Sequence, residues 1–350
     1  MKRDGVIEGV VVTGRGEGAA FTQLEWARRQ FVERLGIDPF PGTLNLILDS
    51  PADLEGWGDL KVGAGRAVMP PNSQWCTAHC YPVRVAGRLP GAIVLPEVPG
   101  YPEAQVEIIA ALSMRETFSL KDGDRLSLEI SQPLSVRAVI FDVDGTLADS
   151  LEAYRVVAEL AAAPHGIVVT REMVRQAMNS DVVFWDLLIP AERPDRGEFI
   201  KQLKEEAIRR WPDALRAHGR LFPGLRGTLE TLHSRGLRLG IVTGSRATVL
   251  QPLHEAGLMD FFDTVVTGKD VQRRKPDPEG LLKCAAALGI APDEAVYVGD
   301  TPLDVQASRA AGMASVAVLS GAGDSALLSA AGPDWIVHSH AGLPEIILRA

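Results

Sequence analysis

The sequence has few of the features that mark secreted, membrane-bound or nucleic-acid-binding proteins. Its 350 residues include three cysteines, too few for a disulfide framework. No apolar run approaches the roughly 20 residues of a membrane-spanning helix, and the first residues lack the apolar core of a signal peptide. The net charge is -9, which argues against broad binding to nucleic acid or anionic membranes. We therefore expect a soluble, cytoplasmic protein that acts on small molecules.

The length and the change of pattern along the chain predict two domains. A chain of 350 residues exceeds the length at which a single core usually stops growing. Up to about residue 130, short apolar segments such as "GVVVTG", "GTLNLIL" and "RLSLEI" alternate with Gly- and Pro-rich turns, which is typical of a compact β-barrel or sandwich. Beyond it, apolar strands alternate with helical segments, which indicates a parallel α/β sheet. We place the domains at residues 1–131 and 132–350.

Helical patterns add detail to both domains. "TQLEWARRQFVERLG" predicts a helix that stops at Gly36, and "EAQVEIIAAL", residues 103–112, is a weaker helix candidate. Residues 152–221 read as helices with no convincing strand, directly after the first strand of the parallel sheet. We expect this insertion to form a helical cap over the carboxyl edge of the sheet, where open α/β sheets bind ligands. The core of that domain is then residues 135–151 and 222–350.

The segment "AVIFDVDGT" ends an apolar strand with Asp142 and Asp144. Residues i and i+2 of an extended strand point to the same side, so both carboxylates can face one site at the edge of the sheet. There a carboxylate can attack an electrophile or hold a divalent cation. The alternative is a strand followed by a turn that uses Asp and Gly for backbone reasons alone.

Three further segments place polar residues at predicted strand ends or helix starts. "GIVTGS" offers a hydroxyl and backbone N–H groups that suit phosphate oxygens. "RRKPDP" supplies a lysine that can offset the repulsion between a carboxylate and a phosphoryl group, and "YVGDTPLD" adds two carboxylates for an oxygen-rich Mg²⁺ site. The residues are Thr243, Gly244, Ser245, Lys275, Asp300 and Asp304.

In this order the segments resemble the four motifs of the haloacid dehalogenase superfamily, over residues 135–350. The resemblance implies that Asp142 is a nucleophile that forms an aspartyl-phosphate, while Asp144 acts as acid and then as base. A second Asp two residues after the first favours phosphoryl transfer over dehalogenation. The implied phosphoryl-binding residues are Thr243 and Lys275 with Gly145, Thr146, Gly244 and Ser245, and the implied Mg²⁺ ligands are Asp142, Asp144 through its carbonyl, Asp300 and, in support, Asp304.

The cap says less about the substrate. The motif followed by a helical insertion resembles the phosphoglycolate phosphatase and β-phosphoglucomutase branch, which does not identify a ligand. Arg155, Trp185 and Arg246 are candidates for substrate contact, although surface or packing roles explain each of them as well. A small phosphate monoester is the expected substrate class.

The N-terminal domain carries its own candidate site. "GRGEG", residues 14–18, follows an apolar strand, and such a glycine loop can bring backbone N–H groups to phosphates or simply turn the chain. Thr43 and Asn45 are alternate residues on one strand face and could hold Mg²⁺ through neutral oxygens. Cys76, His79 and Cys80 supply only three ligands on alternating faces, so we expect no zinc there.

Residues 5–130 resemble the archaeal CTP-dependent riboflavin kinases. The resemblance implies a cradle-loop barrel that uses Mg²⁺ and CTP to convert riboflavin into FMN, releasing CDP. Thr43 and Asn45 match the Mg²⁺ ligands and Glu107 a flavin-binding carboxylate, but Pro99 stands where the family has a threonine, and residues 62–83 lack much of its glycine and phenylalanine pattern. The implied cytidine-nucleotide residues are Gly14, Arg15, Gly16, Glu17, Gly18, Leu112, Ser113, Met114 and Arg115.

Two function hypotheses relate the two domains to each other, and a third is a phosphatase for glycolytic or glycolate-type esters with an unrelated N-terminal passenger. In the first, a riboflavin kinase is fused to a Mg²⁺-dependent phosphatase, which could act on a flavin-pathway intermediate or on FMN. In the second, the N-terminal domain binds flavin or nucleotide without turnover and regulates a phosphoglycolate-like phosphatase. The expected partners are a phosphate ester, riboflavin or FMN, and CTP or CDP, with neither nucleic acid nor membrane; no residue pattern selects an oligomeric state.

Overall fold

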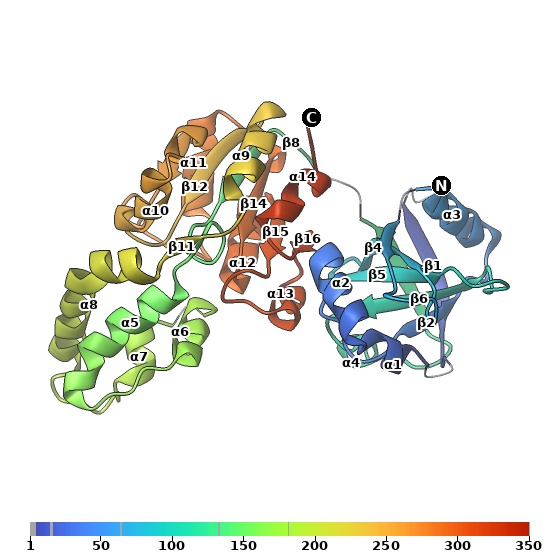
Figure 1. The fold of residues 1–350 in the computed structure, drawn as a ribbon, viewed down its shortest axis with the longest axis horizontal. Helices are drawn as coiled ribbons and strands as arrows, with labels where there is room; N and C mark the ends of the chain where they lie inside the picture. Colours follow the sequence, from blue (N-terminus) through green and yellow to red (C-terminus); the bar gives the residue numbers. More distant parts are fainter. Residues whose placement is uncertain (1–4, 15–16, 64, 132–133, 181, 350) are drawn as a thin grey trace. The chain divides into compact units, whose positions relative to one another are not determined.

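The computed structural model describes residues 5–14, 17–63, 65–131, 134–180 and 182–349. The chain divides into two compact units, drawn in Figure 1. The first unit is residues 1–133 with 325–338, and the second is residues 134–324 with 339–350. Residues 325–338, expected in the C-terminal domain, group with the first unit through contacts such as the hydrogen bond from the Asp38 amide to Ser325 Oγ at 3.1 Å.

The first unit is built on a closed antiparallel barrel, as the strand patterns predict. Its strands follow the order β4-β5-β6-β2-β1-β7, β7 pairs back with β4, and β3 extends the sheet beside β4. Inward-facing residues such as Leu46, Ile108 and Leu128 are buried around Trp57. The strands are β1 (Val6–Val12), β2 (Leu44–Ile47), β3 (Arg66–Val68), β4 (Ala78–Val85), β5 (Leu89–Pro96), β6 (Gln105–Ala110) and β7 (Arg125–Ile130).

Helices cover the barrel where the sequence changes to helical spacing. The expected helix is α2 (Glu25–Leu35), and it ends at Gly36, whose φ of 68° is left-handed and therefore suits glycine. Its buried face, Ala27, Phe31 and Leu35, packs on the outside of the barrel. The remaining elements of this unit are α1 (Glu17–Thr22), α3 (Pro51–Val62), α4 (Met114–Thr117), α13 (Ser325–Ala331) and β16 (Trp335–Val337).

The helix suggested for residues 103–112 is wrong, because this segment contains strand β6. β6 pairs with β2 on one side and with β5 on the other. Val106, Ile108 and Ile109 are β-branched and buried, so two rows of strand pairing and a place in the barrel core outweigh a weak helical spacing.

The second unit contains the predicted parallel sheet. Five strands run parallel in the order β13-β12-β9-β14-β15, with α11 packed on β12 and β13 and α12 on β14 and β15 (Figure 1). All four residues of β9 are buried, as expected for a strand covered on both faces. The elements are β9 (Ala138–Phe141), β12 (Arg238–Val242), β13 (Thr264–Val266), β14 (Ala295–Gly299), β15 (Ala314–Val318), α9 (Leu225–Ser234), α10 (Gln251–Glu255), α11 (Glu279–Leu288) and α12 (Pro302–Ala311).

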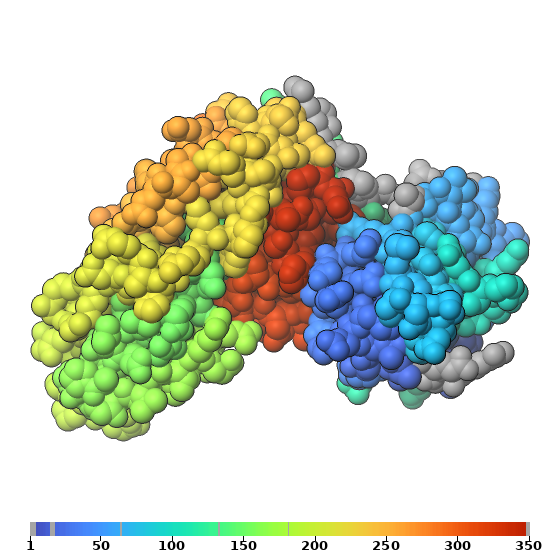
Figure 2. Space-filling view, viewed as in Figure 1, coloured from blue at the N-terminus to red at the C-terminus, as the bar shows by residue number. Residues whose placement is uncertain are grey.

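The inserted cap is helical, as its patterns predict. It is joined to the core by the short antiparallel pair β10 (Ala148–Asp149) and β11 (Arg220–Leu221), and it has its own apolar core around Trp185 and Phe199. Figure 2 shows it as the green to yellow-green lobe. The cap helices are α5 (Leu151–Ala162), α6 (Arg171–Met178), α7 (Phe184–Leu188) and α8 (Arg196–His218).

Short elements complete the second unit: β8 (Leu134–Val136) pairs in parallel with β17 (Ile347–Arg349), and α14 (Leu343–Ile346) precedes β17. The 3₁₀ turns are Ala163–His165, Ala247–Leu250, Met259–Phe261, Pro292–Glu294 and His340–Gly342. Across the described ranges, every helix is too short or too polar to cross a membrane.

Candidate active site

Three neighbouring strands of the parallel sheet end in polar residues that are buried. Asp142 follows β9, Thr243 follows β12 and Asp300 follows β14, and β9 lies between the other two strands. Because parallel strands end at one edge, their termini bring these residues together although they are far apart in the sequence. Their exposed fractions are 6%, 3% and 0%. The sequence prediction of a polar cluster at this edge is matched by the geometry.

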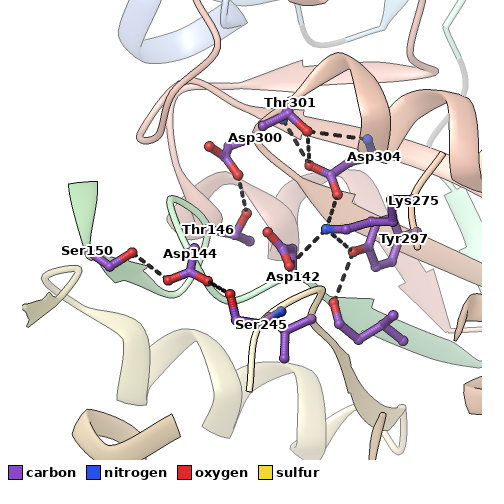
Figure 3. A network of polar contacts seen from close by, with 12 residues as sticks. Asp142, Asp144, Thr146, Ser150, Ser245, Lys275, Tyr297, Asp300, Thr301 and Asp304 are labelled. Atoms are coloured by element: carbon purple, nitrogen blue, oxygen red, sulfur yellow. Dashed lines mark hydrogen bonds and ion pairs between the residues drawn. The ribbon is translucent and has the colours of Figure 1, made fainter. Parts of the chain in front are cut away.

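Lys275 is the cation of the cluster. Its Nζ lies 2.9 Å from Asp142 Oδ1 and 2.6 Å from Asp304 Oδ1 (Figure 3). It also donates to the hydroxyl of Tyr297 at 3.1 Å, and that hydroxyl donates to the carbonyl of Val242 at 3.1 Å. One ammonium group therefore holds two carboxylates from two different elements, and Tyr297, which the motif analysis did not single out, fixes its position.

Asp300 and Asp304 are anchored by backbone and hydroxyl groups. Asp300 Oδ2 accepts from the amide of Ala322 at 2.7 Å, and Oδ1 accepts from the hydroxyl of Thr146 at 3.3 Å. Asp304 lies in the first turn of α12, where Oδ2 accepts from the amide of Thr301 at 3.0 Å and from its hydroxyl at 2.7 Å. This capping arrangement satisfies N–H groups at the helix start and leaves Asp304 Oδ1 for Lys275.

The carboxylates form a candidate cation site. One oxygen each from Asp142, Asp300 and Asp304 lies within 4.8 Å of the other two, and all three residues are buried. Oxygen ligands of this kind are those that Mg²⁺ prefers. Among the described residues, Lys275 is the single cation bonded to the cluster, so three buried carboxylates carry more negative charge than one lysine neutralises. The residues therefore fit a divalent cation.

Burial and crowding shift the pKa values of the cluster. Burial raises the pKa of Asp142 to about 7, opposed by Lys275 and reinforced by Asp304 and Asp144. Burial and the neighbouring carboxylates of Asp304 and Asp142 raise the pKa of Asp300 well above its ordinary value. Burial alone would lower the pKa of Lys275, but Asp142 and Asp304 outweigh it and hold that pKa well above its ordinary range. The lysine is thus charged at neutral pH.

Asp144 has a separate set of partners. Its Oδ1 accepts from the hydroxyl of Ser150 at 2.5 Å, and its Oδ2 accepts from Ser245 Oγ at 2.9 Å and from the hydroxyl of Tyr154 at 3.2 Å. Burial raises the pKa of Asp144, while these three hydroxyls lower it, so the net shift is upward. In Figure 3 its carboxylate points toward Ser150 and Ser245, whereas that of Asp142 points toward Lys275. The two aspartates therefore share an edge of the sheet but not their partners.

Tyr154 reaches the site from cap helix α5, and sequence reasoning missed it. Its hydroxyl contacts Asp144 and lies 2.7 Å from Ser245 Oγ. From the sequence, a tyrosine on an amphipathic helix is interpreted as a packing residue. No local motif predicts that its hydroxyl contacts a residue 91 positions away. The contact depends on the docking of the cap on the core.

The predicted phosphate-binding residues surround the carboxylates. Gly145 has a left-handed φ of 82°, and a Cβ there would lie 2.2 Å from Asp300 Oδ2, so only glycine fits. Thr146 donates to Asp300, and the hydroxyl of Thr243 accepts from the amide of Ser245 at 3.1 Å. Gly244 has open space where a Cβ would be.

A cavity of about 530 Å³ opens beside this cluster. Trp185 and Arg246, two of the three substrate-contact candidates, line it together with Tyr154, Gly244 and Ser245. Arg155 does not line it, because its guanidinium is paired with Glu152 and Glu159 on the same helix.

The first unit also brings its predicted residues together. Thr43 Oγ1 donates to Glu107 Oε2 at 3.1 Å, and Asn45 Oδ1 accepts from Gln105 Nε2 at 3.2 Å. A Cβ on Gly14 would lie 2.3 Å from Asn45 Nδ2, and one on Gly18 would lie 2.5 Å from Thr43 Oγ1. Both ends of the predicted glycine loop therefore touch the predicted Mg²⁺ ligands.

Other predicted residues of this unit can be placed as well. Leu112, Ser113, Met114 and Arg115 line a cavity of about 170 Å³ together with Thr43. Tyr101 donates to Glu107 Oε1 at 3.0 Å, and burial, followed by the Glu107 charge, raises the pKa of Tyr101. Arg15 and Gly16 lie outside the described residues, and of Glu17 the structure describes only the backbone at the start of α1.

The cysteine cluster shows no metal geometry within the described residues. His79 Nε2 lies 2.8 Å from Glu97 Oε1 rather than toward a cysteine, and Cys80 is buried, which raises the pKa of its thiol to about 12. A thiol with so high a pKa is a poor metal ligand at neutral pH.

Comparison with known proteins identifies both parts. The second unit is a parallel α/β sheet with an inserted helical cap and carboxylates at one edge. Residues 139–318 match the family profile described as "Haloacid dehalogenase-like hydrolase". The chain belongs to this family. Residues 11–130 match the profile of the CTP-dependent riboflavin kinase domain, whose description reads "Domain of unknown function DUF120". Both recognitions made from the sequence are confirmed, as are the barrel and the α/β sheet.

Relatives narrow the class of the second unit. A phosphoglycolate phosphatase of Salmonella paratyphi A is 31% identical over 226 residues, covering 59% of this chain and 90% of the relative. A crystal structure from Bacteroides fragilis, assigned as a haloacid dehalogenase-like hydrolase, has a TM-score of 0.52 at 29% identity, covering 59% of this chain and 98% of that chain. One from Lactobacillus delbrueckii, assigned as a phosphoglycolate phosphatase, has a TM-score of 0.54 at 25% identity, covering 61% and 99%. The protein is thus a phosphoric monoester hydrolase of this family with a riboflavin kinase-type domain.

Proposed function

We propose that the second unit is a Mg²⁺-dependent phosphatase in which Asp142 attacks the phosphorus atom of a phosphate monoester. The observation that carries this proposal is the buried ion pair between Asp142 and Lys275 beside Asp300 and Asp304. A phosphate dianion repels an anionic nucleophile, so positive charge must be present at the point of attack. Lys275 supplies part of it.

A divalent cation held by the carboxylates would supply the remaining positive charge. Asp142 and Asp300 would hold Mg²⁺, with Asp304 in support; when bound, Mg²⁺ neutralises charge on the phosphoryl group. The hydroxyl of Thr243 and the backbone N–H of Gly244, at the end of β12, would bind phosphoryl oxygens, while the N–H of Ser245 donates to the Thr243 hydroxyl.

Asp144 would transfer the proton in both steps of the proposed reaction. In the first step a carboxylate oxygen of Asp142 forms a bond to phosphorus, the bond from phosphorus to the ester oxygen breaks, and the alcohol leaves with the proton of Asp144. In the second step water attacks the aspartyl-phosphate, Asp144 accepts a proton from that water, and phosphate departs with Asp142 regenerated. The raised pKa of Asp144 favours the protonated form that the first step needs.

The test of this proposal is phosphate release from a panel of phosphate monoesters. We expect hydrolysis with MgCl₂, loss of hydrolysis in a chelator and no turnover by Asp142→Asn at any Mg²⁺ concentration. Asp149→Asn is the matched control, because Asp149 is an exposed aspartate seven positions along the chain that contacts none of the cluster. Turnover by Asp142→Asn at the wild-type rate would refute the nucleophile.

We further propose that the first unit is a CTP-dependent riboflavin kinase. In support, Gly14 and Gly18 pack against Asn45 and Thr43, which brings a glycine loop for phosphates to the residues assigned to Mg²⁺. Glu107 sits beside them, held by Thr43 and Tyr101, as a carboxylate for the flavin. Full-length protein with riboflavin, CTP and Mg²⁺ should form FMN and CDP, separable by chromatography.

A second candidate for the first unit is a sensor that binds flavin or nucleotide without turnover. Pro99 favours it, because proline has neither the hydroxyl nor the backbone N–H that could bind the flavin at this position. Riboflavin binding without FMN formation, in a sample that does bind CTP, would select the sensor over the kinase.

The fusion suggests that the two units serve the same pathway. We propose that the phosphatase acts on a phosphorylated intermediate of flavin synthesis, 5-amino-6-(5-phosphoribitylamino)uracil, or on FMN itself. If FMN were the substrate, the second unit would hydrolyse the product of the first. We therefore favour the intermediate. Comparing kcat/KM for both compounds with that for a generic aryl phosphate tests the idea, and equal values would remove its support.

A further inference from the structure

The cavity beside the catalytic cluster has walls that a small aliphatic substrate does not need. Its volume of about 530 Å³ falls in the range of about 300–1,000 Å³ that is typical of pockets for drug-sized ligands. Four aromatic side chains line it, and all come from the cap: Tyr154, Phe184, Trp185 and Trp211.

These rings are arranged as two pairs. The centroids of Tyr154 and Trp211 lie 4.4 Å apart at an interplanar angle of 42°, joining α5 to α8. Those of Phe184 and Trp185, both in α7, lie 5.0 Å apart at 70°. Aromatic surfaces of this kind gain most from another planar ring, which can stack against them or meet them edge to face.

The cavity lies next to the proposed catalytic cluster. Gly244 and Ser245 line it, and Ser245 is hydrogen-bonded to Asp144, the proposed proton donor to the leaving alcohol. Gly244 and Arg274 also line a second, small cavity that includes Thr243 and Lys275. A phosphoryl group held at Lys275 would therefore direct its leaving alcohol toward the aromatic walls.

Three cations line the same cavity. Lys204 comes from α8, Arg246 follows Ser245, and Arg274 precedes Lys275. Among the described residues, none of the three has a carboxylate partner, whereas most arginines of the cap are ion-paired. Unpaired cations beside aromatic walls suit a ring that carries carbonyl oxygens or negative charge.

We propose that the phosphatase is selective for phosphate monoesters whose alcohol carries a planar heteroaromatic ring, with the ring bound between the cap aromatics. This proposal rests on the proposed phosphatase function and specifies its substrate class. The carbon skeleton of phosphoglycolate, the substrate that names the relatives, is a two-carbon acid and leaves the aromatic walls without contacts. This substrate class includes flavin and pyrimidine compounds, and it is inferred from the aromatic and cationic side chains that line the cavity.

The experiment compares kcat/KM for two groups of esters with the full-length enzyme and MgCl₂, without CTP. FMN and uridine 5′-monophosphate represent ring-bearing substrates, and 2-phosphoglycolate and glycerol 3-phosphate represent aliphatic ones. We expect at least one ring-bearing ester to exceed both aliphatic esters by tenfold or more, since stacking of a ring on an aromatic side chain is worth about 1–3 kcal/mol, roughly 5–150-fold. Asp142→Asn must abolish release from every ester, which assigns the activity to the second unit.

Variants of Trp211 separate a role in ring binding from a role in folding. Trp211→Ala should raise KM for the preferred ring-bearing ester by about tenfold and change kcat/KM for the aliphatic esters by less than about threefold. Trp211→Phe keeps a ring and should restore most of the affinity. Lys204→Ala should raise KM for the same ester, whereas Lys201→Ala, on the same helix but outside the cavity, should not.

The outcomes distinguish the two levels of inference. If 2-phosphoglycolate is preferred, or if Trp211→Ala weakens all esters equally, the phosphatase stands and the ring proposal is overturned. If neither these esters nor an aryl phosphate releases phosphate with MgCl₂, the phosphatase function itself fails, and the ring proposal falls with it.

Discussion

Replacing Asp142 by Asn should inactivate the phosphatase and at the same time stabilise the metal-free protein. The side chains have nearly the same shape, and an Asn oxygen can still accept a hydrogen bond from Lys275. The substitution removes one of three clustered, buried carboxylates, of which Lys275 is bonded to Asp142 and Asp304. Active-site residues commonly lower stability in this way, because the charge that chemistry needs is costly to bury.

The magnitude follows from the pKa of Asp142. Burial raises that pKa to about 7, compared with 3.8 in the unfolded chain. A raised acid pKa means that the folded protein holds the proton longer, so stability falls as pH rises from about 4 to about 7. The difference of about 3 pKa units corresponds to about 4 kcal/mol at pH 8. Asp142→Asn should recover most of this free energy at pH 8 and less than about 1 kcal/mol at pH 4.

The assay is calorimetric unfolding of the full chain at both pH values, first in a chelator and then with MgCl₂. Mg²⁺ should stabilise the wild type by about 3 kcal/mol at a hundred times its dissociation constant, and it should stabilise Asp142→Asn less. The difference between the two proteins therefore shrinks when the metal is added. Asp149→Asn serves as the control for removing an exposed carboxylate and should behave as the wild type.

One result would refute the electrostatic reasoning directly. If Asp142→Asn unfolds at a lower temperature than the wild type at pH 8 in chelator, the ionised Asp142 stabilises the fold. The ion pair with Lys275 would then outweigh burial and the repulsion from Asp300 and Asp304. An equal gain at pH 4 and pH 8 would also contradict the argument, because a charge effect must disappear when the carboxylate is protonated.

Three further substitutions test other parts of the structure. Gly145→Ala should lower kcat/KM by at least about tenfold and stability by about 1–2 kcal/mol, because the new Cβ would strain a left-handed residue and collide with Asp300. His340→Gln should reduce the loss of stability toward acid. Burial lowers the pKa of His340 to about 4, so the wild type loses up to about 3 kcal/mol as pH falls from 6.5 to 4. The measurement is inactivation by urea at each pH, with the remaining phosphatase activity assayed at pH 7.5. Thr43→Ala should reduce FMN formation by at least about a hundredfold without changing phosphate release, since Thr43 is assigned to the kinase site alone.

Each of these has a control or a contradicting outcome. Gly289→Ala has the same left-handed strain but open space for the Cβ, so equal kinetic losses in the two glycine variants would exclude the collision with Asp300. His338→Gln removes an exposed histidine and should keep the wild-type pH slope, and a steeper slope for His340→Gln would reverse the assigned sign. Unchanged FMN formation by Thr43→Ala would remove this residue from the kinase site.

The convergence of the proposed catalytic residues was predictable because parallel strands end at one edge of the sheet. The order of the segments ending in Asp142, Thr243 and Asp300 was enough to expect convergence, and the geometry brings these residues and Lys275 together. The same local reasoning failed at residues 103–112. There the helical spacing was weak, and pairing with β2 and β5 makes the segment a strand of the barrel.

Long-range contacts set the features that no local pattern carries. Tyr154 meets Asp144 and Ser245 because the cap docks on the core, and Trp211 joins the same wall from the far end of the insertion. The contact of Gly14 with Asn45 likewise depends on the pairing of β1 with β2, in which Val12 lies opposite Asn45. Functional residues at strand ends can be predicted from the order of the segments, because the topology of a parallel sheet brings its strand ends to one edge. Substrate selectivity depends on which side chains line the space above those strands. Packing between segments that are distant in the sequence determines which side chains these are.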